Sequence, residues 1–197
     1  IRGQVAIATT PGKVRRVRLL PGNPPATRQA VDAIMHADLV VLGPGSWFTS
    51  LIPHVLVPDL ANALAATPAR RAIVLNLADE PGETAGFSAE RHLHVLAQHA
   101  PGFTAHDVIV DAGRVAGERE REQLRRAAAM LKAEVSFADV SRPGTPLHDP
   151  AKLAAALNRE GWDGEWYRRA WYDNGAPIGS KASDECKIDA IAQAWAV

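Results

Sequence analysis

The sequence predicts an α/β fold in which a parallel β-sheet carries helices on both faces. Two observations support this prediction. Short runs rich in Val, Leu and Ile alternate along the chain with longer segments of helical periodicity, which is the pattern of repeated βαβ units. Several of these apolar runs are continuous, as expected for strands that are buried on both faces of a sheet.

Turn and capping residues place the elements in order. Residues 5–9 and 14–20 are predicted to form two strands around the turn at Pro11, Gly12 and Lys13. After a loop at 21–25, the predicted elements are a helix capped by Thr27, a strand at 39–42, a short helix beyond the next loop, a helix through Leu60 and Leu64, a strand at 72–75, a helix from Ser88 to about His99, a strand at 107–110, a helix at 118–132, a strand at 134–138 and a helix from 150 to about 159.

The composition is typical of a soluble protein from a reducing compartment. The chain has 197 residues, with 22 basic and 22 acidic side chains, so no net field attracts nucleic acid or an anionic membrane. Cys186 is the only cysteine, which excludes an internal disulfide and a cysteine-based zinc site. No apolar run approaches the roughly 20 residues that span a bilayer, and no signal-peptide pattern follows residue 1. We therefore expect a cytoplasmic protein, and the sequence assigns it no metal or cofactor.

Aromatic residues become frequent after residue 158. Four of the five tryptophans and both tyrosines lie there, whereas residues 1–157 are rich in Ala, Val, Leu, Arg and Pro. The change falls inside a predicted helix, although natural domain boundaries usually fall in exposed linkers. Either two unrelated pieces, 1–157 and 159–197, are joined end to end, or an aromatic C-terminal hairpin packs on a common core. We expect loose packing or local disorder from about residue 160 onward.

The loop at residues 43–50 is the first candidate site. It follows an apolar strand, and Gly43, Pro44 and Gly45 allow a sharp turn and a close approach to a ligand. Its hydroxyls and the free N–H groups of the following helix suit a phosphate or diphosphate. An aromatic side chain, Trp47 or Phe48, is available to stack on a base or cover a sugar. A plain strand-to-helix turn with a capping serine explains the same residues equally well. The hydroxyl-bearing residues of the loop are Ser46, Thr49 and Ser50.

A second candidate site follows the next buried strand. Asn76 ends that strand, and Gly82, Glu83 and Thr84 follow in the loop. Because ligands of parallel sheets bind at the carboxyl ends of the strands, both loops are expected on one rim. Asn76 suits a base or ribose, and Glu83 and Thr84 suit sugar hydroxyls. The alternative is a polar turn that leads into the cap at Ser88.

Three segments of residues 1 to about 157 form a distinctive set of motifs. The first segment, residues 37–50, reads Ala-Asp-Leu-Val-Val-Leu-Gly-Pro-Gly-Ser-Trp-Phe-Thr-Ser, and is followed by Ile52, Pro53, Leu56 and Val57. The second is Pro-Gly-Glu-Thr at 81–84, and the third is Ser-Arg-Pro-Gly-Thr-Pro-Leu-His-Asp at 141–149. Together these segments resemble the gluconeogenesis-factor family, which is related to 2-phospholactate transferases.

The resemblance implies a Rossmann-like fold that binds uridine-diphosphate (UDP) sugars such as UDP-N-acetylglucosamine. It also implies a link between carbon supply, cell-wall synthesis and cell shape, without established catalysis. The family usually has tyrosine where Phe48 stands, so a hydroxyl is lost. The family's opening glycine-rich strand–loop–helix has no counterpart in this sequence, so the expected sheet lacks its first strand and any binding is expected to be weak. Carried over by motif, Gly43, Gly45, Ser46, Phe48 and Thr49 would lie at the nucleotide-sugar site.

Residues 159–197 carry a second set of motifs, at 161–175, 177–180, 184–188 and 193–197. These stretches resemble a different family, glycoside hydrolase family 94, which includes cellobiose phosphorylases. That family's general acid belongs to an Asp-Trp-Asn-Asp-Gly motif, which this sequence lacks. The segment alone therefore assembles neither the two carboxylates of hydrolysis nor the acid of phosphorolysis.

The leading hypothesis is a UDP-sugar-binding regulatory module of the gluconeogenesis-factor type, with an appended foreign tail. The alternatives are an enzyme of the phospholactate-transferase class, a carbohydrate phosphorylase fragment, and a composite chain without a selected function. A homo-oligomer is compatible with each of them.

Overall fold

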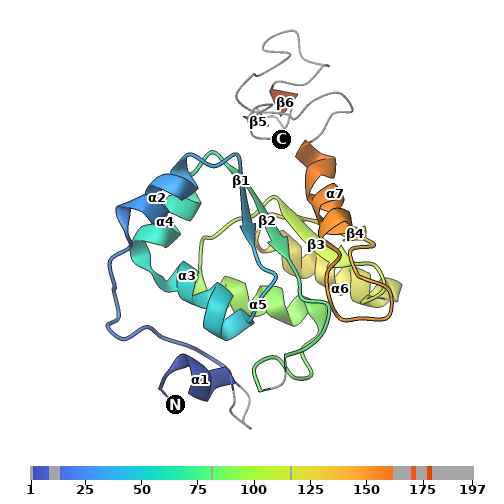
Figure 1. Ribbon diagram of the computed structural model, residues 1–197, viewed down its shortest axis with the longest axis horizontal. Coiled ribbons are helices and arrows are strands. Elements are labelled where there is room, and N and C mark those ends of the chain that lie inside the picture. The colour runs from blue at the N-terminus through green and yellow to red at the C-terminus, as the bar shows by residue number, and fades with distance from the viewer. Residues whose placement is uncertain are drawn as a thin grey trace.

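Four of the predicted strands pair in sequence order into one parallel sheet. The computed structural model in Figure 1 describes residues 2–8, 14–80, 82–115, 117–161, 170–171 and 177–178. The sheet has the order β1-β2-β3-β4, which confirms the predicted α/β class. Its strands are β1 (Leu39–Leu42), β2 (Arg70–Val74), β3 (Asp107–Asp111) and β4 (Glu134–Ala138).

Helices cover both faces of this sheet, as expected from the alternation of strands and helices (Figure 1). On one face, Leu42, Ile73 and Val108 of the strands belong to the larger core. On the other face, Val74 and Ile109 pack against the last long helix. The helices of the first face are α2 (Arg28–Met35), the π-helical turn η1 (Trp47–Leu51), α3 (Ile52–Leu56), α4 (Pro58–Ala66), α5 (Ala89–His99) and α6 (Glu118–Ala129), and α7 (Pro150–Gly161) covers the second face.

Local sequence explains where several helices begin. The Thr27 side chain accepts a hydrogen bond from the Ala30 N–H at 3.3 Å, which confirms Thr27 as the cap of α2. Ser88 occupies the N-cap position of α5, but its hydroxyl donates to the Glu90 carboxylate at 2.5 Å rather than accepting a backbone N–H. Ser88 therefore marks the helix start without capping it through its side chain.

The strand predicted at residues 5–9 is wrong. Residues Gln4–Ala8 form the short helix α1, which lies against η1, and Val5 is 76% exposed. Residues 14–19 form no regular element, although the Val17 N–H donates to His99 Nε2 at 3.3 Å. A strand needs a partner for its backbone groups, and a two-stranded hairpin outside a larger sheet is only marginally stable. The predicted turn at 11–13 lies outside the described residues.

The prediction that residues 39–42 are buried on both faces is also wrong. β1 is an edge strand of the sheet, and Leu39 and Val41 are 37% and 39% exposed. The physical reason is that α7 packs in one cluster with residues of β2, β3 and β4, and no residue of β1 belongs to that cluster. β1 therefore has a buried side toward the larger core and an uncovered side toward the face of α7.

The end of the chain is described in part. α7 runs through the point at which the composition changes, and β5 (Ala170–Trp171) pairs with β6 (Pro177–Ile178) as antiparallel strands. The expected loose packing or disorder from residue 160 onward falls mostly on residues outside the described ranges. Among the helices that the structure describes, none is long and apolar enough to cross a bilayer.

Candidate ligand-binding site

The first loop begins with a turn that only glycine fits. Gly43 has a φ of +91°, and a Cβ added there would lie 2.6 Å from the Val74 carbonyl oxygen. Val74 is the last residue of β2, so the chain leaving β1 passes directly over the end of its neighbour. The absence of a side chain at Gly43 therefore brings this loop and the end of β2 together.

Asn76 joins the two candidate loops. Its Oδ1 accepts the Gly45 N–H at 3.0 Å, and its Nδ2 donates to the Gly45 carbonyl oxygen at 2.9 Å. Nδ2 also donates to Glu80 Oε1 at 3.3 Å. The prediction that both loops lie on the same rim of the sheet is thereby confirmed, and Asn76 is the residue that ties them.

Glu83 makes the second connection between the loops. Its Oε2 accepts hydrogen bonds from Ser46 Oγ at 2.7 Å and from the Phe48 N–H at 3.0 Å. Ser46 Oγ also hydrogen-bonds the Thr49 hydroxyl. Glu83 is only 3% exposed, and Thr84 is fully buried with its Oγ1 accepting the Glu80 N–H at 2.9 Å. Glu83 and Thr84 therefore support the first loop from inside the protein.

The donors at the start of the helix are occupied by side chains of the second loop, whereas the sequence predicts free N–H groups there. Asn76 holds the Gly45 N–H, and Glu83 holds the Phe48 N–H and the Ser46 hydroxyl. An anion of the protein itself thus stands where a ligand phosphate was expected.

The expected stacking of Trp47 or Phe48 on a ligand is not compatible with their burial. Trp47 is fully buried and Phe48 is 1% exposed. The Trp47 ring meets His92 edge-on at 5.0 Å between centroids, and Phe48 meets Phe87 and His99 at 6.2 Å. η1 turns both rings toward the larger core, so they anchor the loop and leave no face for a base.

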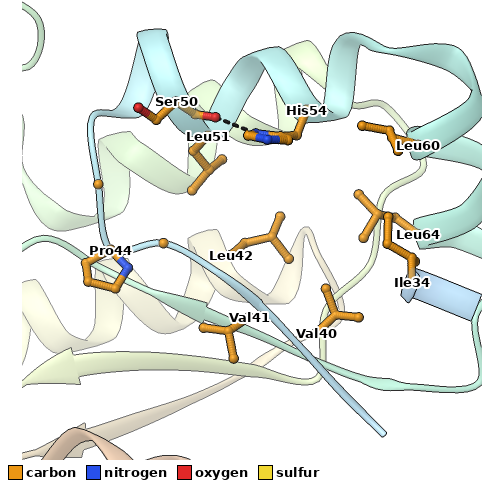
Figure 2. A pocket seen from close by; sticks show the side chains of 12 residues that line it. Ile34, Val40, Val41, Leu42, Pro44, Ser50, Leu51, His54, Leu60 and Leu64 are labelled. Carbon is orange, nitrogen blue, oxygen red and sulfur yellow. Dashed lines mark hydrogen bonds between the residues drawn. The ribbon is translucent and has the colours of Figure 1, made fainter. Parts of the chain in front are cut away.

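A cavity of 320 Å³ opens beside the first loop, between β1 and the helices α2, α3 and α4 (Figure 2). Figure 2 shows Leu42 directed toward the helices and Val41 directed to the opposite side of the strand. The His54 ring N–H donates to the Ser50 carbonyl oxygen at the cavity rim. Apart from His54, Ser50 and the main chain of the two glycines, the walls of the cavity are apolar. The lining consists of Ile34, Val40, Val41, Leu42, Gly43, Pro44, Gly45, Ser50, Leu51, His54, Leu60 and Leu64.

Of the predicted site residues, the cavity gathers Gly43, Pro44, Gly45 and Ser50. Ser46 and Thr49 are half-buried and face the second loop, and Asn76 lies behind Gly45. Gly82 lies in a turn with a φ of +84° and does not line the cavity. The rim therefore has a ligand-facing part and a supporting part.

The charges behind the loop repel one another. Burial raises the pKa of the Glu80 carboxyl, and the neighbouring Glu83 charge raises it further. Hydrogen bonds from Ser46 and the Trp47 backbone act in the opposite direction and lower it.

Arg114 holds the second loop from the side of β3. Its Nη1 donates to the Asn76 carbonyl oxygen, and its Nη2 pairs with Asp79 Oδ1 at 3.0 Å. The second loop is thus fixed from both sides.

A second cavity, of 350 Å³, lies between the carboxyl ends of β2 and β3, and its wall carries more polar groups. Within the part of the chain that the structure describes, no group of three or more His, Cys, Asp or Glu residues could hold a metal ion. The polar residues that line this cavity are Asp79, Ser88, Glu90, Arg114, Glu120 and Gln123.

Sequence reasoning missed Glu80, Arg114 and His54 as parts of this region. Arg114 follows β3 directly, so the rule that places Asn76 at the carboxyl rim also places Arg114 there. Glu80 lies in the loop after β2, so the same rule places it near the rim, although its contact with Asn76 depends on how that loop folds. His54 has no such signal, because its position depends on how η1 folds back.

The comparisons with known proteins assign this arrangement to a family. A family model described as 2-phospho-L-lactate transferase CofD matches residues 1–146. The chain belongs to the CofD family. Its relatives there are gluconeogenesis factors. The protein from Mycobacterium tuberculosis is 84% identical over 158 residues, which cover 80% of this chain and 46% of the relative. The protein from Deinococcus radiodurans is 39% identical over 175 residues, covering 83% of this chain and 37% of the relative.

Solved structures agree with the fold of this CofD-family chain. Two crystal structures of a UPF0052-family protein from Bacillus halodurans superpose with TM-scores of 0.65 and 0.67 at 25% and 27% identity. The match covers 80% of this chain and 55% and 54% of those chains. This CofD-family chain thus spans about half the length of the relatives that it matches, or less.

The tail has a separate similarity. A model described as the catalytic domain of the glycosyl hydrolase 94 superfamily matches residues 142–197. This match begins before α7, whereas the sequence reasoning placed the change near residue 159. Most of the matched residues beyond α7 lie outside the described ranges.

Proposed function

We propose that this CofD-family domain binds a UDP-sugar, such as UDP-N-acetylglucosamine, as a regulatory module without catalysis of its own. In this proposal it links carbon metabolism to cell-wall and cell-shape control. The observation that carries the proposal is the cavity beside the glycine-rich loop, at the carboxyl end of a parallel strand where α/β proteins bind nucleotides.

The cavity offers the two kinds of surface that a nucleotide sugar needs. Leu42, Leu51 and Leu64 present apolar walls to the flat face of a base. Gly43 and Gly45 present main chain without side chains, which allows a close approach. The volume of 320 Å³ lies at the lower end of typical ligand pockets, so it suits one part of the ligand, with the remainder outside.

The diphosphate is assigned to the exposed side of the loop. Pro44 and Ser50 are exposed, whereas the donors of Ser46 and Phe48 face inward to Glu83. The Ser50 hydroxyl is the polar side chain of the loop that both lines the cavity and faces solvent. The base in the cavity and the diphosphate near Ser50 are therefore compatible with the hydrogen bonds inside the protein.

A calorimetric titration with UDP-N-acetylglucosamine tests the proposal. The wild-type chain is expected to release heat on binding, and Leu60→Trp, which fills the cavity, is expected to weaken binding at least tenfold. Met130→Trp, at an exposed position that directly follows α6 and does not line the cavity, serves as the matched control and should bind as the wild type does. Absence of heat at millimolar ligand, with a folded wild-type chain, would exclude the proposal.

The description of the matching family model favours one second candidate, an enzyme of the phospholactate-transferase class. It predicts turnover of a guanylyl-phospholactate with a deazaflavin acceptor. His54 is the one titratable side chain among the residues that line the cavity, which is a sparse set for group transfer. Turnover that Ser50→Ala or His54→Ala abolishes would favour the enzyme over the binding module.

The tail leads to a separate proposal about origin. Residues 1–157 and about 159–197 are proposed to be two unrelated pieces, on the strength of the two family similarities. Sequencing the gene and its transcript tests whether both pieces occur in one open reading frame. Activity of the whole chain on β-glucans with phosphate would instead support a phosphorylase role for the tail.

A further inference from the structure

We infer that Glu83 is a specificity-determining residue that excludes free phosphate groups from the Gly43–Ser50 loop. Its carboxylate accepts hydrogen bonds from the Ser46 hydroxyl and the Phe48 N–H, the donors that a phosphate would need. The inference concerns the same site as the proposed function and refines it, because it says which chemical groups the loop rejects.

The geometry is that of an anion already bound. Glu83 Oε2 accepts from Ser46 Oγ at 2.7 Å and from the Phe48 N–H at 3.0 Å, two donors that converge on one oxygen. The residue is 3% exposed, and its Oε1 is buried without a hydrogen-bond partner among the described residues. A buried carboxylate with one free oxygen is held there by the donors of the loop.

A second carboxylate strengthens the exclusion. Glu80 accepts from Asn76 Nδ2 at 3.3 Å and lies close enough to Glu83 for the two charges to repel. A phosphate placed at the position of the Glu83 carboxylate would therefore meet the Glu80 carboxylate, and the Ser46 and Phe48 donors there are already taken by Glu83. Phosphate binding at loops of this type depends on the opposite arrangement, in which N–H and hydroxyl donors point outward.

This arrangement selects for the uncharged parts of a ligand. A base or sugar that enters the cavity from the side of Gly43 and Ser50 does not compete with Glu83 for Ser46 or Phe48. Inorganic phosphate, pyrophosphate and terminal phosphate groups do compete. The loop thus discriminates a nucleotide sugar from free phosphates: the base of a nucleotide sugar is held in the cavity and its diphosphate stays on the Ser50 side, whereas a free phosphate has only the donors that Glu83 occupies.

The experiment uses inorganic pyrophosphate as the probe and the whole chain without any nucleotide sugar. Phosphorus NMR line broadening or calorimetry measures binding to the wild type, Glu83→Ala, Glu83→Gln and the control Glu122→Ala, which removes an exposed carboxylate on α6. Circular dichroism checks that each variant is folded. The wild type and the control are expected to bind no pyrophosphate at millimolar concentration.

Glu83→Ala is expected to bind pyrophosphate at least tenfold more tightly than the wild type, and adding Ser46→Ala to it should remove most of the gain. A merely structural role for Glu83 does not produce such a gain. If Glu83→Ala does not fold, Glu83→Gln decides: it keeps an acceptor for Ser46 and Phe48 but removes the charge, so it should bind pyrophosphate more tightly than the wild type by a smaller factor than Glu83→Ala. Folded variants that bind no better than the wild type, or a wild type that already binds, overturn the inference. Because no UDP-sugar is present, this outcome is independent of the proposed function.

Discussion

Glu83 and Ser46 lie 37 residues apart in the sequence, yet the Ser46 hydroxyl donates to the Glu83 carboxylate at 2.7 Å. The contact connects the loops that follow β1 and β2. With the Asn76–Gly45 pair, it makes the second loop a rigid support for the first. The candidate site is therefore held in shape by residues that do not line it.

Gly43→Ala is expected to destabilise the protein by about 2–3 kcal/mol, because alanine is strained at positive φ and its Cβ would lie 2.6 Å from the Val74 carbonyl oxygen. Gly45→Ala is the matched control. At Gly45 an added Cβ meets nothing closer than Ser50 Cβ at 4.0 Å. Urea unfolding of the two variants measures the difference, and equal free energies of unfolding would contradict the account of this turn.

Asn76→Ala is expected to cost roughly 1–3 kcal/mol, since it leaves the Gly45 N–H and carbonyl without partners near the core. It should also weaken UDP-sugar binding, because the first loop loses its support. Asn62→Ala, at an exposed position on α4, should leave both quantities unchanged. The measurements are chemical unfolding and calorimetry. An Asn76→Ala chain of wild-type stability would show that the two loops are not tied through this side chain.

His92 makes stability depend on pH. Burial lowers the pKa of His92 below its ordinary value, Arg114 lowers it further, and the Ser88 carbonyl, Asp79 and Glu90 oppose this. The ring therefore binds a proton less readily in the folded state than in the unfolded chain, where a histidine is protonated below a pH of about 6.5. The free energy of unfolding should therefore fall as the pH decreases below about 6.5. His106 and His148, whose pKa values burial also lowers, act in the same direction.

Thermal unfolding of wild type and His92→Phe between about pH 7.5 and 5.5, on either side of the ordinary histidine pKa, measures the contribution of His92. The variant is expected to lose less stability on acidification than the wild type. His94→Phe, at an exposed position on the same helix, is the control and should retain the wild-type slope. Identical slopes for wild type and His92→Phe would show that the buried ring does not cause the acid sensitivity.

The sequence predicts the sheet well because its signals are local. Thr27, the glycine-rich turn after β1 and the apolar runs place most helices and all four strands of the sheet. Residues 5–9 have the composition of a strand, but their structure depends on whether a partner strand is available. Burial of Leu39 and Val41 likewise depends on where β1 lies in the sheet and how far α7 extends.

The site is predicted in outline only. The position of Asn76 after β2 correctly predicts that it shares a rim with Gly45. The hydrogen bond from Phe48 to Glu83, and the inward rotation of Phe48, depend on how two separate loops pack. The sequence around a loop carboxylate does not show whether it faces a ligand sugar or accepts hydrogen bonds from the protein's own N–H and O–H groups, as Glu83 does.

The most direct test of the central claim is an amide NMR titration of the folded chain with UDP-N-acetylglucosamine. The proposed site predicts that the signals of Gly43, Gly45, Ser50 and His54 shift together, while that of Met130, which follows α6 and does not line the cavity, stays in place. Shifts confined instead to Ser88, Glu90 and Gln123 around the second cavity, or no shifts at millimolar ligand, would contradict it.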